Sequence, residues 1–360
     1  MVRALMLVSA SVDEALRHQV AQGTRPTPEY LKLEQVHGVQ LLDWSRAGFG
    51  PGRRSVGRSL RHALAALHTR PGADVIFSDG EHVGVPLAVA MDAMRIRVPH
   101  MVIGHHLLTP AKERVFRHLR AARRIDRVVV HSSNQVAAVV DRLGFRPEQV
   151  VVVPYGVDAA FWAGGSAGAE EDGLVVSAGR EHRDYRTLVE ALPAGVRLSI
   201  ADHSLYTPHA TRRDPLQWPD RVERVGVDPR GLRDLYRRAS VVAVPVMRST
   251  MPAGITTLLE AMAMGKAVVV TETPELAGVV ADGRTGLTVP AGDTAAMRSA
   301  LEVLLDSPEL RRRLGKRARQ AVLERYDVDL YAAALAAHVR DLAGHPMTPA
   351  TAAPDRPGCR

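Results

Sequence analysis

The sequence contains a single cysteine, Cys359, which lies close to the C-terminal end of the chain. One cysteine excludes disulfides within the chain and metal sites built from several thiolates. A reducing cytoplasm is therefore the expected location. Aromatic residues make up only 4% of the sequence. Stacked aromatic platforms for nucleic acid are consequently not expected, and neither is a nucleic-acid partner.

Long apolar runs are also missing. The first ten residues, M-V-R-A-L-M-L-V-S-A, hold an apolar stretch too short for the core of a secretory signal, and we expect it to form a first strand. No run of about twenty uninterrupted apolar residues is present, so a membrane-spanning helix is not expected. P-loop motifs, Ser–His–Asp hydrolase signatures and zinc-ligand spacings are absent as well.

The length of 360 residues fits two domains better than one. A hydrophobic content of 46% and a charged content of 24% are typical of a soluble globular protein. The formal net charge of +8 suits anionic partners such as nucleotides or phospholipid head groups. An arginine-rich surface from a high-GC genome explains the same charge without any partner.

The segment 244–293 has the most informative pattern in the chain. An apolar strand over 241–246 leads into a loop that holds Pro252 and Gly254, and a helix is predicted to begin near Ile255. A second apolar strand follows at 267–270, so the segment reads as one strand–helix–strand unit of a parallel sheet. Ligands of such sheets bind outside the carboxyl ends of the strands. The unpaired N–H groups that open the helix suit a phosphate group.

Glu260 is the unusual residue of the predicted helix, because it lies among apolar neighbours. A carboxylate in such surroundings usually has a polar partner. One interpretation is a glutamate at the edge of the buried face that bonds to nearby backbone. The other is a carboxylate that accepts hydrogen bonds from a diol such as a ribose.

The run L-L-E-A-M-A-M-G-K-A-V-V-V-T, from Leu258 to Thr271, resembles the donor-nucleotide site of the retaining glycosyltransferases of family 4, which have the GT-B fold. Pro274-Glu275, Asp282-Gly283, Thr285-Gly286-Leu287 and Pro290 continue the resemblance. In that family the last Glu of a Glu-x7-Glu motif holds the donor ribose, and Glu260 matches it. Pro252 stands where the first Glu, which contacts the donor sugar, is expected. The resemblance is strongest over 174–342.

The resemblance implies an α/β protein of the GT-B type, with two Rossmann-like domains that face each other across a cleft. Pro154-Tyr155-Gly156-Val157-Asp158 resembles the family's Asn-Gly-Val-Asp hinge, with Tyr155 in place of Asn. The predicted parts are an acceptor domain over 1–160, a flexible linker over 161–172, a donor domain over 173–326, a helix over 327–343 that crosses back to the first domain, and a disordered tail over 344–360.

The resemblance also implies which residues bind the donor diphosphate. Arg180 and Arg183 match the two family cations that reach it, and arginine suits phosphate because its planar fork carries several donors. A surface position is the alternative for each. Backbone N–H groups and hydroxyls at the helix start are expected to add further donors, from Ala253, Gly254, Ile255, Thr256 and Thr257. No metal and no cofactor is then required beyond the nucleoside diphosphate sugar.

Two histidines, His105 and His106, follow Gly104 at the end of a predicted strand over 100–103. A neutral imidazole there could orient or deprotonate an acceptor hydroxyl, or bind a donor phosphate. The resemblance favours such a role, and His105 is preferred as the catalytic residue. The alternative is a pair of loop histidines whose hydrogen bonds are satisfied locally.

The segment 111–127 carries seven lysines and arginines against two acidic residues. Val115, Leu119 and Ala122 recur in it at roughly helical spacing. One hypothesis is an amphipathic helix that lies on anionic lipid, so that the protein is peripherally associated with a membrane. The other is a solvated charged face of a soluble protein.

Together these patterns predict an enzyme that transfers a sugar, with retention, from a nucleoside diphosphate sugar to a hydroxyl acceptor on a glycan, a glycolipid or a small molecule. The departure at Pro252 leaves two alternatives open. One is a catalytically inactive GT-B protein that regulates another enzyme. The other is a related GT-B activity such as nucleotide-sugar epimerisation or phosphorolysis, although the epimerases' paired carboxylates are not evident.

Overall fold

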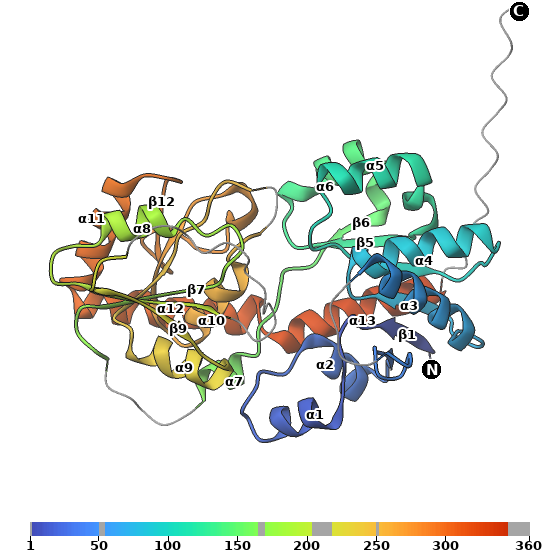
Figure 1. Cartoon of the computed structure of the whole chain (residues 1–360), viewed down its shortest axis with the longest axis horizontal. Helices are drawn as coiled ribbons and strands as arrows, with labels where there is room; N and C mark the ends of the chain where they lie inside the picture. The colour runs from blue at the N-terminus through green and yellow to red at the C-terminus, as the bar shows by residue number, and fades with distance from the viewer. Residues whose placement is uncertain (1, 50–54, 165–169, 204–217, 250–251, 345–360) are drawn as a thin grey trace, which may run out of the picture.

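The computed structural model describes residues 2–49, 55–164, 170–203, 218–249 and 252–344. They form two α/β domains that lie side by side, the N-terminal one on the right of Figure 1 and the C-terminal one on the left. Each domain is built on a parallel sheet. The predicted disordered tail, 344–360, lies outside the described residues apart from Gly344.

The N-terminal sheet has the strand order β2-β1-β3-β4-β5-β6, and every pairing in it is parallel. Its central strands are short apolar runs, as expected of strands covered on both faces. The strands are β1 (Ala4–Leu7), β2 (Gln40–Leu42), β3 (Val75–Ser78), β4 (His100–Ile103), β5 (Arg127–Val130) and β6 (Val150–Val152). The helices are α1 (Glu14–Ala21), α2 (Glu29–His37), α3 (Val56–Thr69), α4 (Glu81–Ala93), α5 (Pro110–Leu119) and α6 (Asn134–Leu143).

The C-terminal sheet repeats this plan with the order β12-β11-β10-β7-β8-β9. Its strands are β7 (Leu174–Ala178), β8 (Arg197–His203), β9 (Val222–Gly226), β10 (Val241–Val244), β11 (Ala267–Thr271) and β12 (Leu287–Val289). Its helices are α7 (Ala159–Ala163), α8 (Tyr185–Ala191), α9 (Pro229–Arg238), α10 (Ile255–Ala263), α11 (Thr294–Leu305) and α12 (Pro308–Arg325). The strand–helix–strand unit predicted from the sequence is confirmed as β10, α10 and β11.

The last helix, α13 (Val328–Gly344), leaves the C-terminal domain and packs on the N-terminal one (Figure 1). Its apolar face, including Tyr331, Leu335 and Val339, is buried in the same core as Met6 of β1 and Leu31 of α2. This helix is the C-terminal crossover helix expected of the GT-B fold, for which the predicted range was 327–343. Because α13 covers one face of the first sheet, the N-terminal core is completed by the C-terminal end of the described chain.

The polypeptide crosses between the domains twice at one place. Val157 donates its N–H to the carbonyl of Tyr326 at 2.9 Å, and Val328 donates to the carbonyl of Val157, also at 2.9 Å. Gly156 allows this close approach, because a Cβ there would lie 2.6 Å from the Cβ of Tyr331. The two connections are thus hydrogen-bonded to each other.

The prediction of a single amphipathic helix over 111–127 is wrong. Helix α5 ends at Leu119, Arg120 takes a left-handed conformation with φ of 50°, and a short 3-10 helix (Ala121–Arg124) follows before β5. The break has a packing reason, since it allows Ala121, Ala122 and Ile125 to be buried. The helical spacing continued across Arg120, so the sequence pattern did not reveal it.

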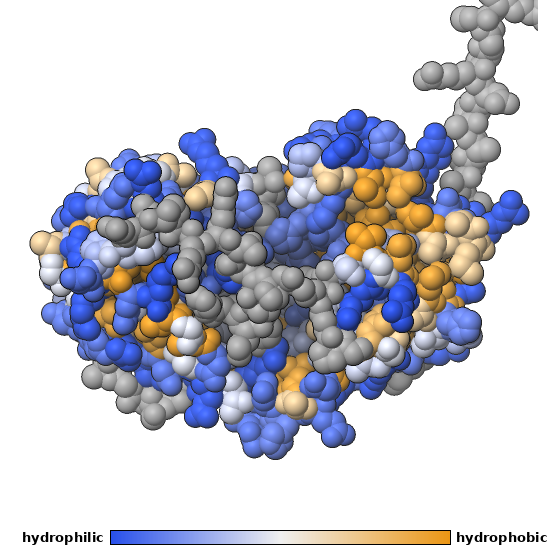
Figure 2. Space-filling view, viewed as in Figure 1, coloured by the Kyte–Doolittle hydropathy of each residue, from blue (hydrophilic) through white to orange (hydrophobic). Residues whose placement is uncertain are grey.

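Several cations of this segment have intramolecular partners. Lys112 contacts the carboxylate of Glu81, Arg124 pairs with Asp92, and Arg127 pairs with Asp341 of α13 at 2.7 Å. Val115 and Leu119 of α5 remain exposed, as do Val56, Leu60 and Leu64 along α3. Figure 2 shows polar surface at the upper right, where α5 lies, and apolar surface on the N-terminal domain just below it.

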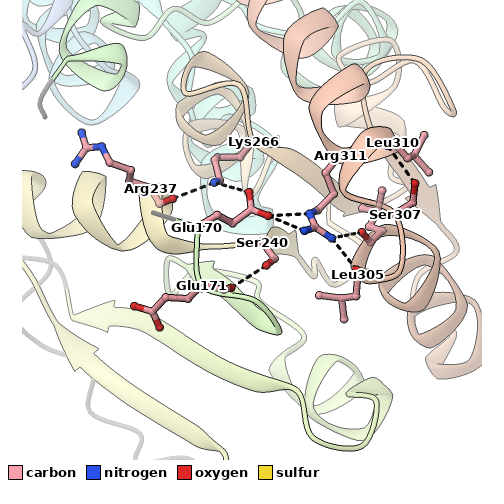
Figure 3. A network of polar contacts seen from close by, with 10 residues as sticks. Glu170, Glu171, Arg237, Ser240, Lys266, Leu305, Ser307, Leu310 and Arg311 are labelled. Atoms are coloured by element: carbon pink, nitrogen blue, oxygen red, sulfur yellow. Dashed lines mark hydrogen bonds and ion pairs between the residues drawn. The ribbon is translucent and has the colours of Figure 1, made fainter. Parts of the chain in front are cut away.

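The segment 161–172, predicted as a flexible linker, is anchored at both of its described ends. Phe161 and Trp162 are buried in the C-terminal core. Glu170 accepts hydrogen bonds from Nε and Nη2 of Arg311 at 2.9 and 2.7 Å, and Arg311 also donates to carbonyls at the end of α11 (Figure 3). The C-terminal domain therefore begins at α7, which differs from the prediction. The middle of the predicted linker, 165–169, lies outside the described residues.

Gly315 of α12 provides a test of the C-terminal packing. A Cβ at this position would lie 1.9 Å from the carbonyl oxygen of Gly265, so Gly315→Ala must force backbone apart. We expect the free energy of unfolding to fall by about 2 to 3 kcal/mol, measured by urea denaturation. Gly57→Ala on α3 is the matched control, because nothing lies within 4 Å of its added Cβ. Equal stability of the two variants would contradict the packing described.

Candidate active site

A cavity of about 600 Å³ lies between the domains, at the carboxyl ends of strands from both sheets. The N-terminal domain lines it with Pro26, His105, His106, His131 and Tyr155. The C-terminal domain lines it with Trp162 and residues 178–181, 183, 201–202, 227–229, 232, 252–257 and 260. The predicted site residues are thus brought to one cavity, although they come from distant parts of the sequence.

The start of α10 forms one wall of the cavity. Gly254 caps the helix with a left-handed φ of 86°, and a Cβ there would lie 2.9 Å from Val244, so a glycine is needed. The N–H of Ile255 donates to the carbonyl of Pro252 at 3.2 Å. The next N–H groups of the first helical turn have no intrahelical carbonyl to bind, so Thr256 and Thr257 present backbone donors at the cavity, where the helix dipole is positive.

Arg183 lies beside this helix start and is almost completely buried, with 9% of its surface exposed. Its Nε donates to the carbonyl of Ala178 at 2.8 Å, and its Nη1 donates to the carbonyl of Glu181 at 2.9 Å. Its Nη2 donates to the hydroxyl of Thr257 at 3.1 Å. Burial lowers the pKa of Arg183 from its ordinary value. These bonds hold a fixed positive charge next to the first turn of α10.

Gly179 makes the position of Arg183 possible. Its φ is 95°, and a Cβ on it would lie 2.3 Å from Nη2 of Arg183. Arg180, the neighbouring residue, also lines the cavity. The loop that carries both arginines is tied to the loop after β10, because Met247 donates to the carbonyl of His182 at 2.9 Å and Asp184 donates to that of Pro245 at 3.1 Å. The loop that carries the two arginines and the loop that precedes α10 are therefore held in position together.

Glu260 lies one turn deeper along α10 and is partly buried at the cavity wall. Its Oε2 accepts a hydrogen bond from the hydroxyl of Tyr236 at 3.3 Å. Burial raises the pKa of Glu260 to about 8, against a smaller lowering by Tyr236 and Arg183. The carboxyl group thus faces the ligand space with one protein partner, which leaves acceptor capacity for a ligand.

His105 is held on the opposite wall by two hydrogen bonds. Its backbone N–H donates to Oε2 of Glu81 at 3.0 Å, and its Nε2 lies 2.9 Å from the carbonyl oxygen of Asp79. Burial alone would raise the pKa of Glu81, but Lys112, His105 and hydrogen bonds lower it to about 2. A charged Glu81 therefore fixes the loop that carries His105.

His106 reaches towards the other domain. Its Nε2 lies 3.8 Å from Oε2 of Glu181, and both residues line the cavity. Burial lowers the pKa of His106, while Glu81 and Glu181 oppose this effect. The contact joins the loop after β4 to the loop after β7.

His131 and Tyr155 line the N-terminal side of the cavity and were not predicted as site residues. His131 directly follows β5 and Tyr155 lies in the hinge, and their rings are 5.2 Å apart. The signal that could have identified His131 is its place after a buried strand, where parallel sheets bind ligands. Among the described residues, no group of three or more His, Cys, Asp or Glu side chains is placed to hold a metal ion.

Comparison with known proteins identifies the family. The model for Glycosyl transferases group 1 matches residues 174–307, and the model for Glycosyltransferase Family 4 matches residues 8–161. The chain belongs to glycosyltransferase family 4. A D-inositol 3-phosphate glycosyltransferase from Nocardia farcinica is 27% identical over 223 residues, which cover 54% of this chain and 48% of that protein. The match thus spans about half the length of this curated relative.

Solved structures share the fold. Sucrose-phosphate synthase from Thermosynechococcus elongatus superimposes with a TM-score of 0.71 and 20% identity, over 95% of this chain and 99% of that one. Anabaena HepE in complex with UDP and glucose gives a TM-score of 0.69 and 18% identity, over 94% of this chain and all of that one. The predicted GT-B fold is confirmed. Within the described residues, no helix is both long and apolar enough to cross a membrane.

Glu260 should contribute to stability in a pH-dependent way. With a pKa raised from 4.5 to about 8, the folded protein keeps a proton in this range that the unfolded chain releases. The contribution of protonated Glu260 to the free energy of unfolding is therefore fully present below pH 4.5 and is lost as the pH rises through about 8. We expect the Tm to fall more steeply with pH in wild type than in Glu260→Gln, by differential scanning calorimetry.

The control for this experiment is Glu302→Gln, because Glu302 is an exposed glutamate of α11. This variant should follow the wild-type pH dependence. If Glu260→Gln shows the same slope as wild type, Glu260 does not titrate as described.

Proposed function

We propose that this chain transfers a sugar from a nucleoside diphosphate sugar to a hydroxyl group of an acceptor, with retention of the anomeric configuration. The observation that carries the proposal is the shared cavity, in which Arg183 and the first turn of α10 face the histidines of the other domain. Retention rests on the family resemblance. A catalytically inactive regulatory protein is the alternative, because Pro252 replaces the first glutamate of the family motif.

The diphosphate is proposed to bind between Arg183, Arg180 and the first turn of α10. Transfer of the sugar leaves negative charge on the diphosphate, and fixed donors stabilise such charge in a water-poor cavity by several kcal/mol. The hydrogen bonds of Arg183 to Ala178, Glu181 and Thr257 keep its guanidinium in place before the ligand arrives. Positive charge from these residues is the proposed source of stabilisation, and no resident cofactor or metal is part of the proposal.

The ribose of the donor is proposed to bind Glu260. A carboxyl group can form hydrogen bonds with two vicinal hydroxyls. Among the described residues, Oε2 of Glu260 accepts from the hydroxyl of Tyr236, and no hydrogen bond engages Oε1. Anabaena HepE was solved with UDP, with UDP and glucose, and with UDP-glucose. Uridine diphosphate is therefore the first nucleotide to test.

Pro252 lines the cavity beside Ala253 and Gly254. A proline offers the donor sugar neither a carboxylate nor an N–H group. We therefore propose a donor sugar that makes fewer polar contacts at this position than the family motif provides. The acceptor hydroxyl would approach from the N-terminal wall, where His105 is the proposed orienting or proton-accepting group.

Nucleotide binding provides the direct test of the donor site. We expect UDP to raise the Tm of the wild type, because a ligand of the native state stabilises it. Arg183→Ala should weaken UDP binding by roughly 10- to 100-fold, since hydrogen bonds to charged groups contribute about 1.5 to 3 kcal/mol each. Isothermal titration calorimetry measures the affinity directly. Glu260→Gln should weaken it as well.

The matched control is Arg186→Ala, because Arg186 is exposed on α8 and pairs with Glu190 on the same helix. This variant should bind UDP as the wild type does. A panel of nucleoside diphosphates extends the experiment to other bases. If none of them raises the Tm, the inactive alternative is favoured and the donor site is refuted.

We also propose peripheral contact with anionic membranes through the N-terminal domain. The exposed side chains Val115 and Leu119 of α5 lie beside Arg114 and Arg117 of the same helix, and α3 exposes a second apolar row. Apolar side chains flanked by cations suit the interface of anionic bilayers.

Co-sedimentation with liposomes tests this contact. We expect binding to vesicles that contain anionic lipid at low salt, and weaker binding at high salt because the charges are screened. Arg114→Glu combined with Arg117→Glu should abolish it. Arg312→Glu, a single charge reversal on α12 of the other domain, is the control. Absence of wild-type binding at low salt would end the membrane proposal.

A further inference from the structure

The N-terminal wall of the cavity carries a pair of imidazoles that lie side by side. His105 follows β4 and His131 follows β5, which is the neighbouring strand of the sheet. Their ring centroids are 5.5 Å apart, with 35° between the ring planes. Because adjacent parallel strands end at the same edge, the fold itself places the two rings together.

The proton of His131 is located by its surroundings. Nδ1 lies 3.1 Å from the carbonyl oxygen of Val153. A carbonyl only accepts hydrogen bonds, so Nδ1 carries the hydrogen and Nε2 of the neutral ring carries a lone pair. Burial lowers the pKa of His131 to about 3, and the ring is therefore neutral at physiological pH.

Nε2 of His131 is buried and has no hydrogen-bond partner among the described residues. Most buried polar atoms in proteins do have a partner, and the exceptions call for an explanation. The ring of His131 lines the cavity. His131 thus keeps one unused hydrogen-bond acceptor, Nε2, on a residue of the wall where the acceptor substrate is expected.

The neighbours of His131 have the same chemical character. Nε2 of His105 lies 2.9 Å from the carbonyl oxygen of Asp79, so its other ring nitrogen is the acceptor when the ring is neutral. This wall therefore presents the lone pairs of two imidazoles. Hydroxyl groups complement them because they donate hydrogen bonds, whereas an ionised phosphate oxygen brings only further lone pairs.

We propose that His131 is a specificity-determining residue of the acceptor site, whose Nε2 accepts a hydrogen bond from an uncharged hydroxyl group of the acceptor. The wall formed with His105 then selects the polyol face of an acceptor over a phosphorylated one. This inference rests on the glycosyl transfer proposed above, because it assigns the N-terminal wall to the acceptor.

The spectroscopic test uses protein labelled with ¹⁵N-histidine and two small probes, glycerol for a polyol and inorganic phosphate for an anion. The Nε2 signal of His131 is assigned from its loss in His131→Gln. With UDP present, we expect glycerol to shift this signal in a saturable way and phosphate to leave it unchanged. A signal that glycerol does not move, or that phosphate moves instead, overturns the inference.

Two substitutions distinguish the effect of losing the Nε2 lone pair from the effect of losing the packing of the ring. His131→Asn keeps a side-chain N–H near the Nδ1 position for Val153 but has no atom at the position of Nε2. His131→Gln places its amide oxygen near that position instead. We expect glycerol affinity, followed by ligand-observed NMR, to fall at least about tenfold in His131→Asn and to be largely retained in His131→Gln. Equal affinities of the two variants contradict the assignment.

The affinity for UDP, measured on the same samples, distinguishes this inference from the proposed function. Both variants should keep the wild-type UDP affinity and a cooperative thermal transition. Loss of UDP binding in His131→Asn together with glycerol binding would indicate a structural role and overturn the inference. If the wild type binds no nucleotide, the donor site fails, while the shift of His131 by glycerol still decides whether its Nε2 binds a hydroxyl.

Discussion

The candidate active site depends on one buried guanidinium. Arg183 bridges the loop after β7 and the first turn of α10, because it binds the carbonyl of Ala178 and the hydroxyl of Thr257. The bridge requires Gly179, whose missing side chain leaves room for the guanidinium, and Gly254, whose left-handed conformation starts α10 in the right place. Backbone conformation, helix start and positive charge are therefore set by the same few contacts.

The two walls of the cavity have opposite hydrogen-bonding character. The C-terminal wall offers donors, through Arg183 and the amides of α10, whereas the N-terminal wall offers the acceptor atoms of His105 and His131. A donor diphosphate accepts hydrogen bonds, whereas a hydroxyl-bearing acceptor can donate them. The cavity thus has the polarity needed to orient the two substrates of a glycosyl transfer, and Glu260 places a carboxyl group beside the donors of α10.

The sequence predicted the parts of this site that lie within one continuous segment. The β10–α10–β11 unit, Gly254 and Glu260 follow from local periodicity, glycine position and the family resemblance. The position of His131 after a buried strand was a usable signal, but its pairing with His105 joins two strands and is encoded by no local pattern. The helix predicted across Arg120 failed for a related reason, since the break follows from burial of Ala121 and Ala122 against the rest of the domain. Tertiary packing overrode a helical spacing that was present in the sequence.

The paired crossing at Val157 restricts how the two halves of the molecule can move. Both connections pass through one point, where Val157 is hydrogen-bonded to Tyr326 and Val328. A rigid-body rotation of one half against the other must pivot about this point, and displacements grow with distance from it. Helix α13 would turn with the N-terminal half, because its apolar face is buried there. A swing about this hinge would change the separation of residues that meet across the cavity, such as His106 and Glu181.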